Sequence, residues 1–300
     1  MPVIKQARQN KQSGQWLILA AAGLWGTTGT AQAFAPHGAH PASVGAVRLL
    51  VGGLTLLLFA ALRGAFRGQK QWLSPGTATA AVCIALYQLC FFAGVARTGV
   101  AAGTIVAIGS APIFAGLLGL FIRGERPAWK WGIATALAVL GCAFLIADRG
   151  QLRVNLPGIL LALGAGLAYA IYAVASKGLL EKHPPEAAMA IIFSLGAVLL
   201  IPVLVTSDLT WIANPRGIGV ALHLGLVTTA FAYVLFARGL RLIPVATAVT
   251  LSLAEPLTAA LLGLVVLGEQ LTLLAFSGIG LIFSGLIFLS INPIISLKAT

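Results

Sequence analysis

The residues of this sequence that could do chemistry are the few polar side chains inside long apolar stretches, and Glu255 is the clearest of them. It lies near the middle of its stretch, directly before Pro256. If that stretch spans a membrane, a charged side chain there costs roughly 2.5–3.5 kcal/mol on insertion scales. Glu255 could bind a substrate ammonium group or carry a coupling proton. Alternatively, it could pair with Arg48 or accept hydrogen bonds from backbone groups that the proline frees. Because acids inside membranes are functional by default, we expect a direct role.

Arg48 lies about seven residues into its own stretch, on the order of 10 Å deep at 1.5 Å per residue. At that depth the side chain could reach back to the membrane surface or pair with a helix end, and we favour such a structural or gating role. Pro112 and Pro256 also fall inside apolar stretches and can bend helices. Such bends suit gating, although ordinary membrane helices contain them too.

Two stripes of polar and aromatic residues have the spacing i, i+3, i+7 and therefore share one helical face each. The first comprises Trp25, Thr28 and Gln32, and the second, 144 residues later, comprises Tyr169, Tyr172 and Ser176. Matching faces of this kind could line a cavity, whereas packing and anchoring at the membrane surface are the alternatives. Trp25 and Tyr169 lie about halfway along their stretches, where surface anchoring fits poorly, so we favour the cavity.

Further aromatic, amide and hydroxyl side chains are assigned to the same cavity. They are Tyr87, Gln88, Phe91, Thr228, Thr229 and Tyr233. Amide and hydroxyl groups at membrane depth prefer a wet cavity or a partner helix.

Catalysis is poorly supported by the residue types present. Cys83, Cys90 and Cys142 lie inside apolar runs without metal-ligand spacing, so we expect packing residues. Ser110 with His223 is the only conceivable nucleophile and base, and neither a Gly-x-Ser-x-Gly elbow nor a His-Glu-x-x-His motif occurs. We therefore expect no metal, no cofactor and no enzymatic activity.

The composition requires a membrane as the solvent. Of the 300 residues 59% are hydrophobic and only 9% are charged, and the mean hydropathy is +0.99. A soluble domain carries about 25% charged residues. The net charge of +12 could indicate nucleic acid, but the basic residues are spread over loops, without an interleaved aromatic patch. We expect membrane lipid around the protein and no nucleic-acid partner.

Apolar runs bounded by proline, glycine or charge predict an all-α polytopic membrane protein with ten transmembrane helices. The expected spans are 16–35, 42–62, 76–96, 100–122, 128–147, 156–176, 187–205, 217–237, 246–267 and 271–291. Fourteen of the 19 Lys and Arg residues then lie on one side and four on the other, and Arg48 lies within a span. The positive-inside rule places both termini in the cytoplasm. A cleaved signal peptide ending at Ala31-Gln32-Ala33 is the alternative, but the first apolar stretch is long for one, and we expect a retained helix.

The sequence contains an internal duplication with an offset of 144 residues. Segment 112–124 with Glu125 aligns with segment 256–268 with Glu269, and eight of these fourteen positions are identical. Each half, 1–150 and 151–300, is expected to hold five helices. Because five is odd, the second half would enter the membrane from the opposite face. Such an inverted repeat is the architecture of many alternating-access transporters.

At these residues the chain resembles the EamA-type drug/metabolite transporter superfamily. The resemblance rests on Leu24-Trp25-Gly26, on Arg48, and on the two Pro…Gly-Glu segments, and it covers essentially the whole chain. Within the superfamily it looks most like the YddG-type amino-acid exporters. One departure is that Arg48 aligns with Ile192, so the cavity should be asymmetric.

The resemblance implies export of amino acids or related metabolites across a bacterial inner membrane. The aromatic, hydroxyl-lined cavity favours neutral or aromatic amino acids. Export or import of other small solutes or drugs, a channel, and an intramembrane enzyme are the alternatives, and the oligomeric state and energy coupling stay open.

Overall fold

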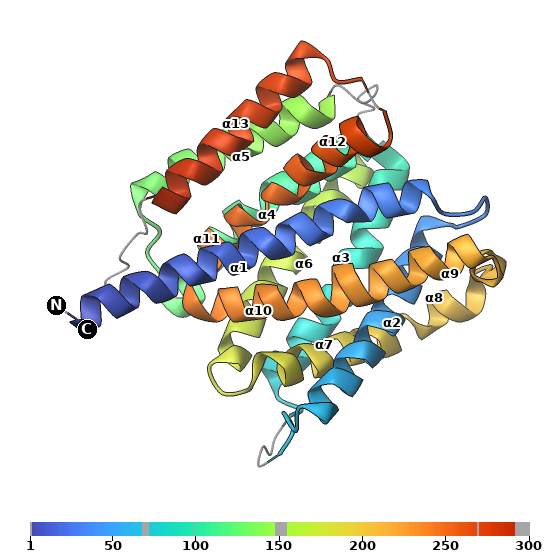
Figure 1. Cartoon of the computed structure of the whole chain (residues 1–300), viewed down its shortest axis with the longest axis horizontal. Helices are drawn as coiled ribbons and strands as arrows, with labels where there is room; N and C mark the ends of the chain where they lie inside the picture. The colour runs from blue at the N-terminus through green and yellow to red at the C-terminus, as the bar shows by residue number, and fades with distance from the viewer. Residues whose placement is uncertain (1, 68–71, 99, 148–154, 269, 292–300) are drawn as a thin grey trace.

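Helices are the only regular secondary structure in the part of the chain that the computed structural model describes, residues 2–67, 72–98, 100–147, 155–268 and 270–291 (Figure 1). In chain order the elements are α1 (Pro2–Ala33), α2 (Pro41–Leu62), α3 (Pro75–Thr98), α4 (Val100–Arg123), α5 (Trp129–Ala147), α6 (Leu156–Leu180), α7 (Pro185–Leu199), α8 (Ile201–Thr206), η1 (Thr210–Ala213), α9 (Pro215–Leu222), the π-helix η2 (His223–Phe231), α10 (Ala232–Leu242), α11 (Val245–Leu251), α12 (Ala254–Val266) and α13 (Leu273–Ile291). The predicted all-helical fold is thus confirmed for these residues.

Each predicted span falls on one helix or on a run of consecutive helices: α7 with α8, α9 with η2 and α10, and α11 with α12. Seven segments of the described chain are long and apolar enough to cross a membrane. They are Pro41–Leu62, Pro75–Thr98, Gly103–Arg123, Leu156–Leu180, Pro215–Leu242, Val245–Val266 and Leu273–Ser290. Large apolar side chains on their outer faces are exposed, such as Phe121 at 79% and Leu273 at 84%, as expected of surfaces in contact with lipid. The protein is therefore a multi-pass membrane protein, and the crossing by all ten predicted helices stays a prediction.

Local sequence signals set the ends of the helices. Asn155 accepts a hydrogen bond from the Gly158 N–H at 2.9 Å and so caps the start of α6. The glycines of the two Gly-Glu pairs have positive φ, +64° at Gly124 and +67° at Gly268. Glycine adopts this conformation without strain and commonly ends helices in this way. The repeated glycine therefore stops α4 and α12 at equivalent points.

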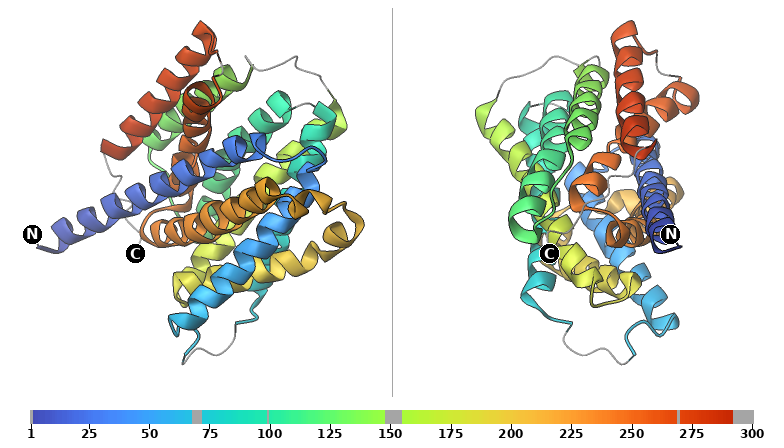
Figure 2. Two further views of the ribbon diagram at one scale, coloured as in Figure 1. Left: turned by 45° about the vertical axis from the view of Figure 1, so that its right-hand side comes forward. Right: turned by 90° about the vertical axis from the view of Figure 1, so that its left-hand side faces the viewer.

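The helices of the two halves are interleaved. α1 packs on α10 and α12 of the second half, while α6 packs on α3 and α4 of the first half. Repeat counterparts also pair directly: α2 lies against α7, and α5 lies against α13, at the upper left of Figure 1 and again together in Figure 2. Glycines bring the second pair close, because a Cβ on Gly141 would lie 2.6 Å from the Gly278 carbonyl oxygen. Among the described residues, one core cluster of buried side chains draws members from both halves, from Ile18 in α1 to Leu289 in α13.

Candidate functional site

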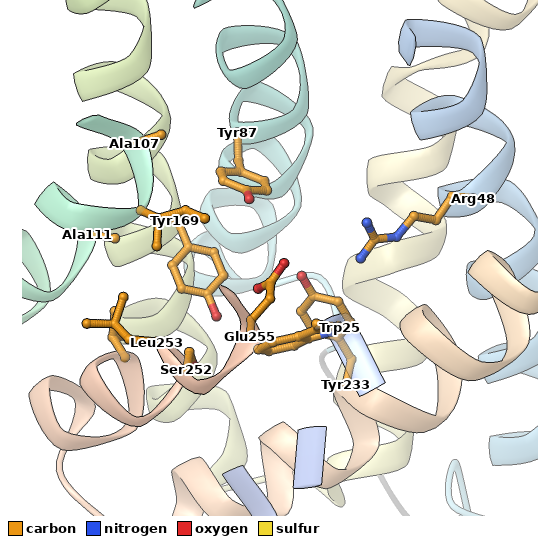
Figure 3. A pocket seen from close by; sticks show the side chains of 12 residues that line it. Trp25, Arg48, Tyr87, Ala107, Ala111, Tyr169, Tyr233, Ser252, Leu253 and Glu255 are labelled. Carbon is orange, nitrogen blue, oxygen red and sulfur yellow. The ribbon is translucent and has the colours of Figure 1, made fainter. Parts of the chain in front are cut away.

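A cavity of about 60 Å³ lies where the first and second halves meet (Figure 3). Its lining residues come from both halves and are Trp25, Arg48, Tyr87, Ala107, Ile108, Ala111, Tyr169, Tyr233, Val249, Ser252, Leu253 and Glu255. A cavity of this volume has room for a few water molecules. A larger molecule requires the surrounding helices to move apart.

Glu255 lies beside a break in the helical rod formed by α11 and α12. α11 ends at Leu251 and α12 begins at Ala254, and the Glu255 N–H donates to the Ser252 carbonyl across the break at 2.9 Å. Glu255 therefore occupies the first turn of α12, where a helix N-terminus favours negative charge. Pro256 occupies the same turn, in which a missing N–H is tolerated. In the first half, the equivalent Pro112 lies inside the continuous helix α4.

Gly26 allows α1 to approach this break closely. A Cβ on Gly26 would lie 2.8 Å from the Glu255 carbonyl oxygen and 2.5 Å from the Thr258 Cβ. Both distances are too short for a side chain, so glycine is required at this crossing. The close approach of α1 brings the ring of neighbouring Trp25 into the cavity beside Glu255 (Figure 3).

Arg48 enters the cavity from α2 and is held by the π-helix η2. Its Nε donates to Thr229 Oγ1 at 2.9 Å, and Thr229 Oγ1 donates in turn to the Leu224 carbonyl, five residues earlier. α2 can lie this close to η2 because glycines occupy the contact: a Cβ on Gly52 would lie 2.3 Å from the Thr229 Cγ2. π-Helical turns occur frequently at functional sites.

The two charged groups lie on different walls of the cavity, and their heads are directed into it (Figure 3). No ion pair joins Arg48 to Glu255, both of which are in the described part of the chain. Each has its own local support, the Thr229 hydroxyl for the guanidinium and the α12 N-terminus for the carboxylate. The cavity therefore presents one positive and one negative group that are separated in space.

Aromatic rings fill the walls around these charges. Trp25 and Tyr233 lie with ring centroids 4.8 Å apart, and Tyr87 and Tyr169 lie 5.5 Å apart. Tyr172 supports this cluster from behind, since its ring lies 5.9 Å from that of Tyr169 and its hydroxyl donates to the Met189 Sδ at 3.4 Å. Aromatic faces attract cations and bury apolar side chains.

The structure brings together some of the predicted site residues and not others. Predicted residues that line the cavity are Trp25, Tyr87, Tyr169, Tyr233 and Glu255, together with Arg48, for which we expected only a structural or gating role. Predicted residues outside its lining are Thr28, Gln32, Gln88, Phe91, Tyr172, Ser176, Thr228 and Thr229. Thr229 acts through Arg48, Phe91 stacks on Tyr87 with centroids 5.8 Å apart, and Gln32 is exposed near the end of α1.

Sequence reasoning missed the small and apolar lining residues. These are Ala107, Ile108, Ala111, Val249, Ser252 and Leu253. Two signals could have found part of this set: Ser252 lies three residues before Glu255, and Ala111 directly precedes Pro112.

The residues considered for catalysis, His223 and Ser110, contact other groups and not each other. His223 Nε2 lies 2.8 Å from Thr27 Oγ1, whereas Ser110 Oγ donates to the Ala107 carbonyl at 3.3 Å. These contacts do not pair the histidine with the serine. Cys83, Cys90 and Cys142 are free thiols, and the described residues contain no group of three or more His, Cys, Asp or Glu side chains that could hold a metal ion.

A multi-pass helical fold with charged side chains at an internal site is typical of membrane transporters. The model of the EamA-like transporter family matches residues 12–147 and, 144 residues further on, residues 156–291, so the chain belongs to this family. The protein is a membrane transporter of small metabolites.

Several relatives match over different shares of the chain. An uncharacterized transporter of Bacillus subtilis (strain 168), YwfM, is 47% identical over 92% of this chain and 93% of its own. The threonine/homoserine exporter RhtA of Escherichia coli (strain K12) is 35% identical over 49% of this chain and 50% of its own. A solved crystal structure superimposes with a TM-score of 0.81 at 21% identity, covering 93% of this chain and 96% of that one, which shows the fold alone.

Proposed function

We propose that the protein exports amino acids, most of all neutral and aromatic ones, across the bacterial inner membrane by alternating access. The observation that carries this proposal is the placement of Arg48 and Glu255 on different walls of one aromatic cavity. An α-amino acid at neutral pH carries one carboxylate and one ammonium group. Arg48 would bind the carboxylate, Glu255 the ammonium group, and the rings between them an uncharged side chain.

One further observation supports the amino-acid assignment, and another supports alternating access. The exporter RhtA, which matches half of the chain, is named for threonine and homoserine, and both are neutral amino acids. The narrower resemblance to YddG-type exporters is part of the same proposal. The small volume of the cavity supports alternating access, because a substrate larger than a few water molecules would need the helices around it to separate.

The interleaved packing supports a two-fold inverted repeat of five helices in residues 1–150 and five in 151–300. α1 and α6 each pack on helices of the other half. The repeat counterparts α2 and α7 pack together, and so do α5 and α13. Such packing is expected around a pseudo-two-fold axis in the membrane plane. Together with the bias of basic residues, this arrangement supports ten membrane spans and cytoplasmic termini.

Counterflow in proteoliposomes tests the proposal. Vesicles loaded with unlabelled threonine or phenylalanine should accumulate external labelled amino acid, because a carrier exchanges its substrate and a channel does not. As competitors, the methyl ester lacks the carboxylate and the N-acetyl derivative lacks the ammonium group. We expect each to compete at least about tenfold more weakly than the free amino acid, a loss of about 1.4 kcal/mol. Equal competition by all three forms would refute binding of the zwitterion.

A further inference from the structure

A second cluster of charged residues joins the two halves at a distance from the cavity. It lies where α4 and α6 end and α11 begins. We call this end of the bundle the basic end, because it carries Arg63, Arg123, Lys177 and Arg238. The cluster is centred on Glu125, the acidic residue of the first Gly-Glu pair. None of its residues lines the cavity.

Glu125 binds two elements of the second half at once. Its Oε2 accepts the Val245 N–H at 2.8 Å, and its Oε1 lies 2.9 Å from the Lys177 Nζ. α11 has no capping side chain of its own, because Pro244 precedes it. A carboxylate from the first half thus fills the N-terminal capping position of a helix in the second half.

Lys177 and Arg123 extend this connection. The Lys177 Nζ also donates to the Ile243 carbonyl at 2.5 Å, which ties α6 to the segment that leads into α11. Arg123, at the end of α4, forms an ion pair with Glu181, just beyond the end of α6. The side chains of Glu125 and Lys177 are only 14% and 12% exposed. Removing the Glu125 carboxylate is costly, because it leaves the buried Lys177 charge without its partner.

The three elements that this cluster connects are also walls of the cavity. α4 contributes Ala107 and Ala111, α6 contributes Tyr169, and α11 contributes Val249. These helices run from the cavity toward the basic end. In α6, the length of helix from Tyr169 to Lys177 is about 12 Å, at 1.5 Å per residue. If a substrate passes between these helices on its way to the basic end, they must separate, and the bonds to Glu125 must break.

The 144-residue repeat does not reproduce the partners of this cluster in the sequence. By the 144-residue offset, the counterparts of Arg123, Lys177 and Glu181 are Leu267, Ala33 and His37. A symmetric carrier would close both ends with equivalent contacts. Here the acidic residue is repeated, as Glu269, but its lysine and arginine partners are not.

We propose that Glu125, Lys177 and the Val245 N–H form the gate at the basic end, and that this gate must open in every transport cycle. The inference rests on the proposed carrier function. Glu125→Gln keeps an acceptor for the Val245 N–H but removes the ion pair. Lys177→Met removes the ion pair and keeps the carboxylate cap. Both variants should shift the protein toward conformations open at the basic end.

Accessibility of the cavity to a thiol reagent tests the gate without measuring transport. The reporter is Ser252→Cys in the cavity, in a chain from which Cys83 and Cys90 are removed and the fully buried Cys142 is kept as a monitor of folding. A membrane-impermeant maleimide is added separately to each side of the membrane. We expect Glu125→Gln and Lys177→Met to raise the labelling rate from the basic end by about tenfold, the shift expected when about 1.4 kcal/mol of closure is lost.

The matched control is Glu186→Gln. It breaks the ion pair between Arg238 on α10 and Glu186 on α7, two elements of the second half, and should leave the labelling rate unchanged. The gate is refuted if neither gate variant raises labelling, or if the control raises it equally while Cys142 stays unreactive. Labelling that rises as expected, with no amino-acid counterflow, would refute the proposed substrate and keep the gate. Counterflow in the wild type, with unchanged labelling in the gate variants, would refute the gate and keep the proposed substrate.

Discussion

Arg48 and Glu255 share a cavity without neutralising each other, and the reason lies in their immediate neighbours. The Thr229 hydroxyl engages the Arg48 Nε, and the first turn of α12 favours the charge of Glu255. A direct ion pair would leave no charge for a substrate. Because each group has separate support, both can exchange water for substrate atoms.

The first prediction concerns Glu255→Gln, which keeps the side-chain shape and removes the charge. We expect counterflow of neutral amino acids to fall at least about tenfold, because a neutral amide attracts an ammonium group far less than a carboxylate does. The amount of folded protein in the membrane should not fall, since the variant no longer carries a charge at membrane depth. Asp208→Asn, in an exposed loop, is the control. Wild-type exchange by Glu255→Gln at both neutral and acidic pH would contradict the role proposed for this residue.

The second prediction concerns Thr229→Val, with Thr228→Val as its neighbour control. Both hydroxyls donate to the Leu224 carbonyl, and only that of Thr229 accepts a bond from Arg48. A hydrogen bond to a charged group contributes about 1.5–3 kcal/mol, so Thr229→Val should weaken substrate affinity about tenfold or more. Thr228→Val should affect stability only. Affinity is measured by competition in counterflow, and equal losses in both variants would show that Arg48 needs no support from Thr229.

At the residue scale, the sequence predicted the acidic residue and several rings of the site, because a carboxylate or an indole at midspan has few structural uses. It could not predict that Arg48 faces the cavity. The hydroxyl that holds Arg48 is 181 positions away and is presented by a π-helix that no local pattern indicates. Of the stripe Trp25, Thr28 and Gln32, only Trp25 lines the cavity, and the reason is geometric. Seven residues of helix extend about 10 Å, and a small cavity touches only part of that length.

At the element scale, the interruption between α11 and α12 is the feature that distinguishes the two halves. Pro112 and Pro256 are repeat counterparts, and yet α4 is continuous through its proline while α12 begins just before its own. The sequence predicted the bend-prone positions and the helix ends, since proline and glycine act locally. The sequence did not reveal which of the two prolines lies beside a break in its helix, because the break depends on the neighbouring helices. At α12 that neighbour is α1, which crosses at Gly26 close to the Glu255 carbonyl oxygen.

The third prediction tests this crossing with Gly26→Ala and its helix mate Gly29→Ala. A Cβ on Gly26 would meet Thr258 at 2.5 Å, whereas a Cβ on Gly29 meets nothing within 4 Å. Overpacking costs about 1–3 kcal/mol, so Gly26→Ala should lower thermal stability in detergent and reduce counterflow. Gly29→Ala should be neutral or slightly stabilising, because alanine favours helix. If the two variants melt at the same temperature, the close approach of α1 and α12 is wrong.

At the scale of the whole molecule, the lengths of the apolar runs and the internal repeat predict most of the positions of the helices. Ten apolar runs predicted where the helices lie, and the offset of 144 residues reappears in the two matches to the family model. The packing of the helices against one another could not be predicted in this way, because the apolar faces of different helices have similar sequence patterns. Which surfaces meet depends on small residues such as Gly141 and Gly278, whose backbones approach closely.

The fourth prediction is the orientation, with ten spans and both termini in the cytoplasm. The asymmetric distribution of Lys and Arg motivates it. A reporter that is active only in the periplasm, fused after Thr300, should give no activity, and the same reporter fused in the loop after Leu209 should give strong activity. Strong activity after Thr300 would overturn both the orientation and the even number of spans.

The exchanged position of α1 has a consequence for how the chain is made. α1 leaves the ribosome before its partners α10 and α12, which follow about 200 residues later. At about 5–20 residues per second, α1 waits roughly 10–40 s before its contact surface can be covered. During that interval Trp25 and the glycines of α1 must lie against lipid, the insertion machinery or an incomplete first half. Substitutions on this face of α1 should therefore reduce the yield of newly made protein more than they reduce the stability of protein already assembled.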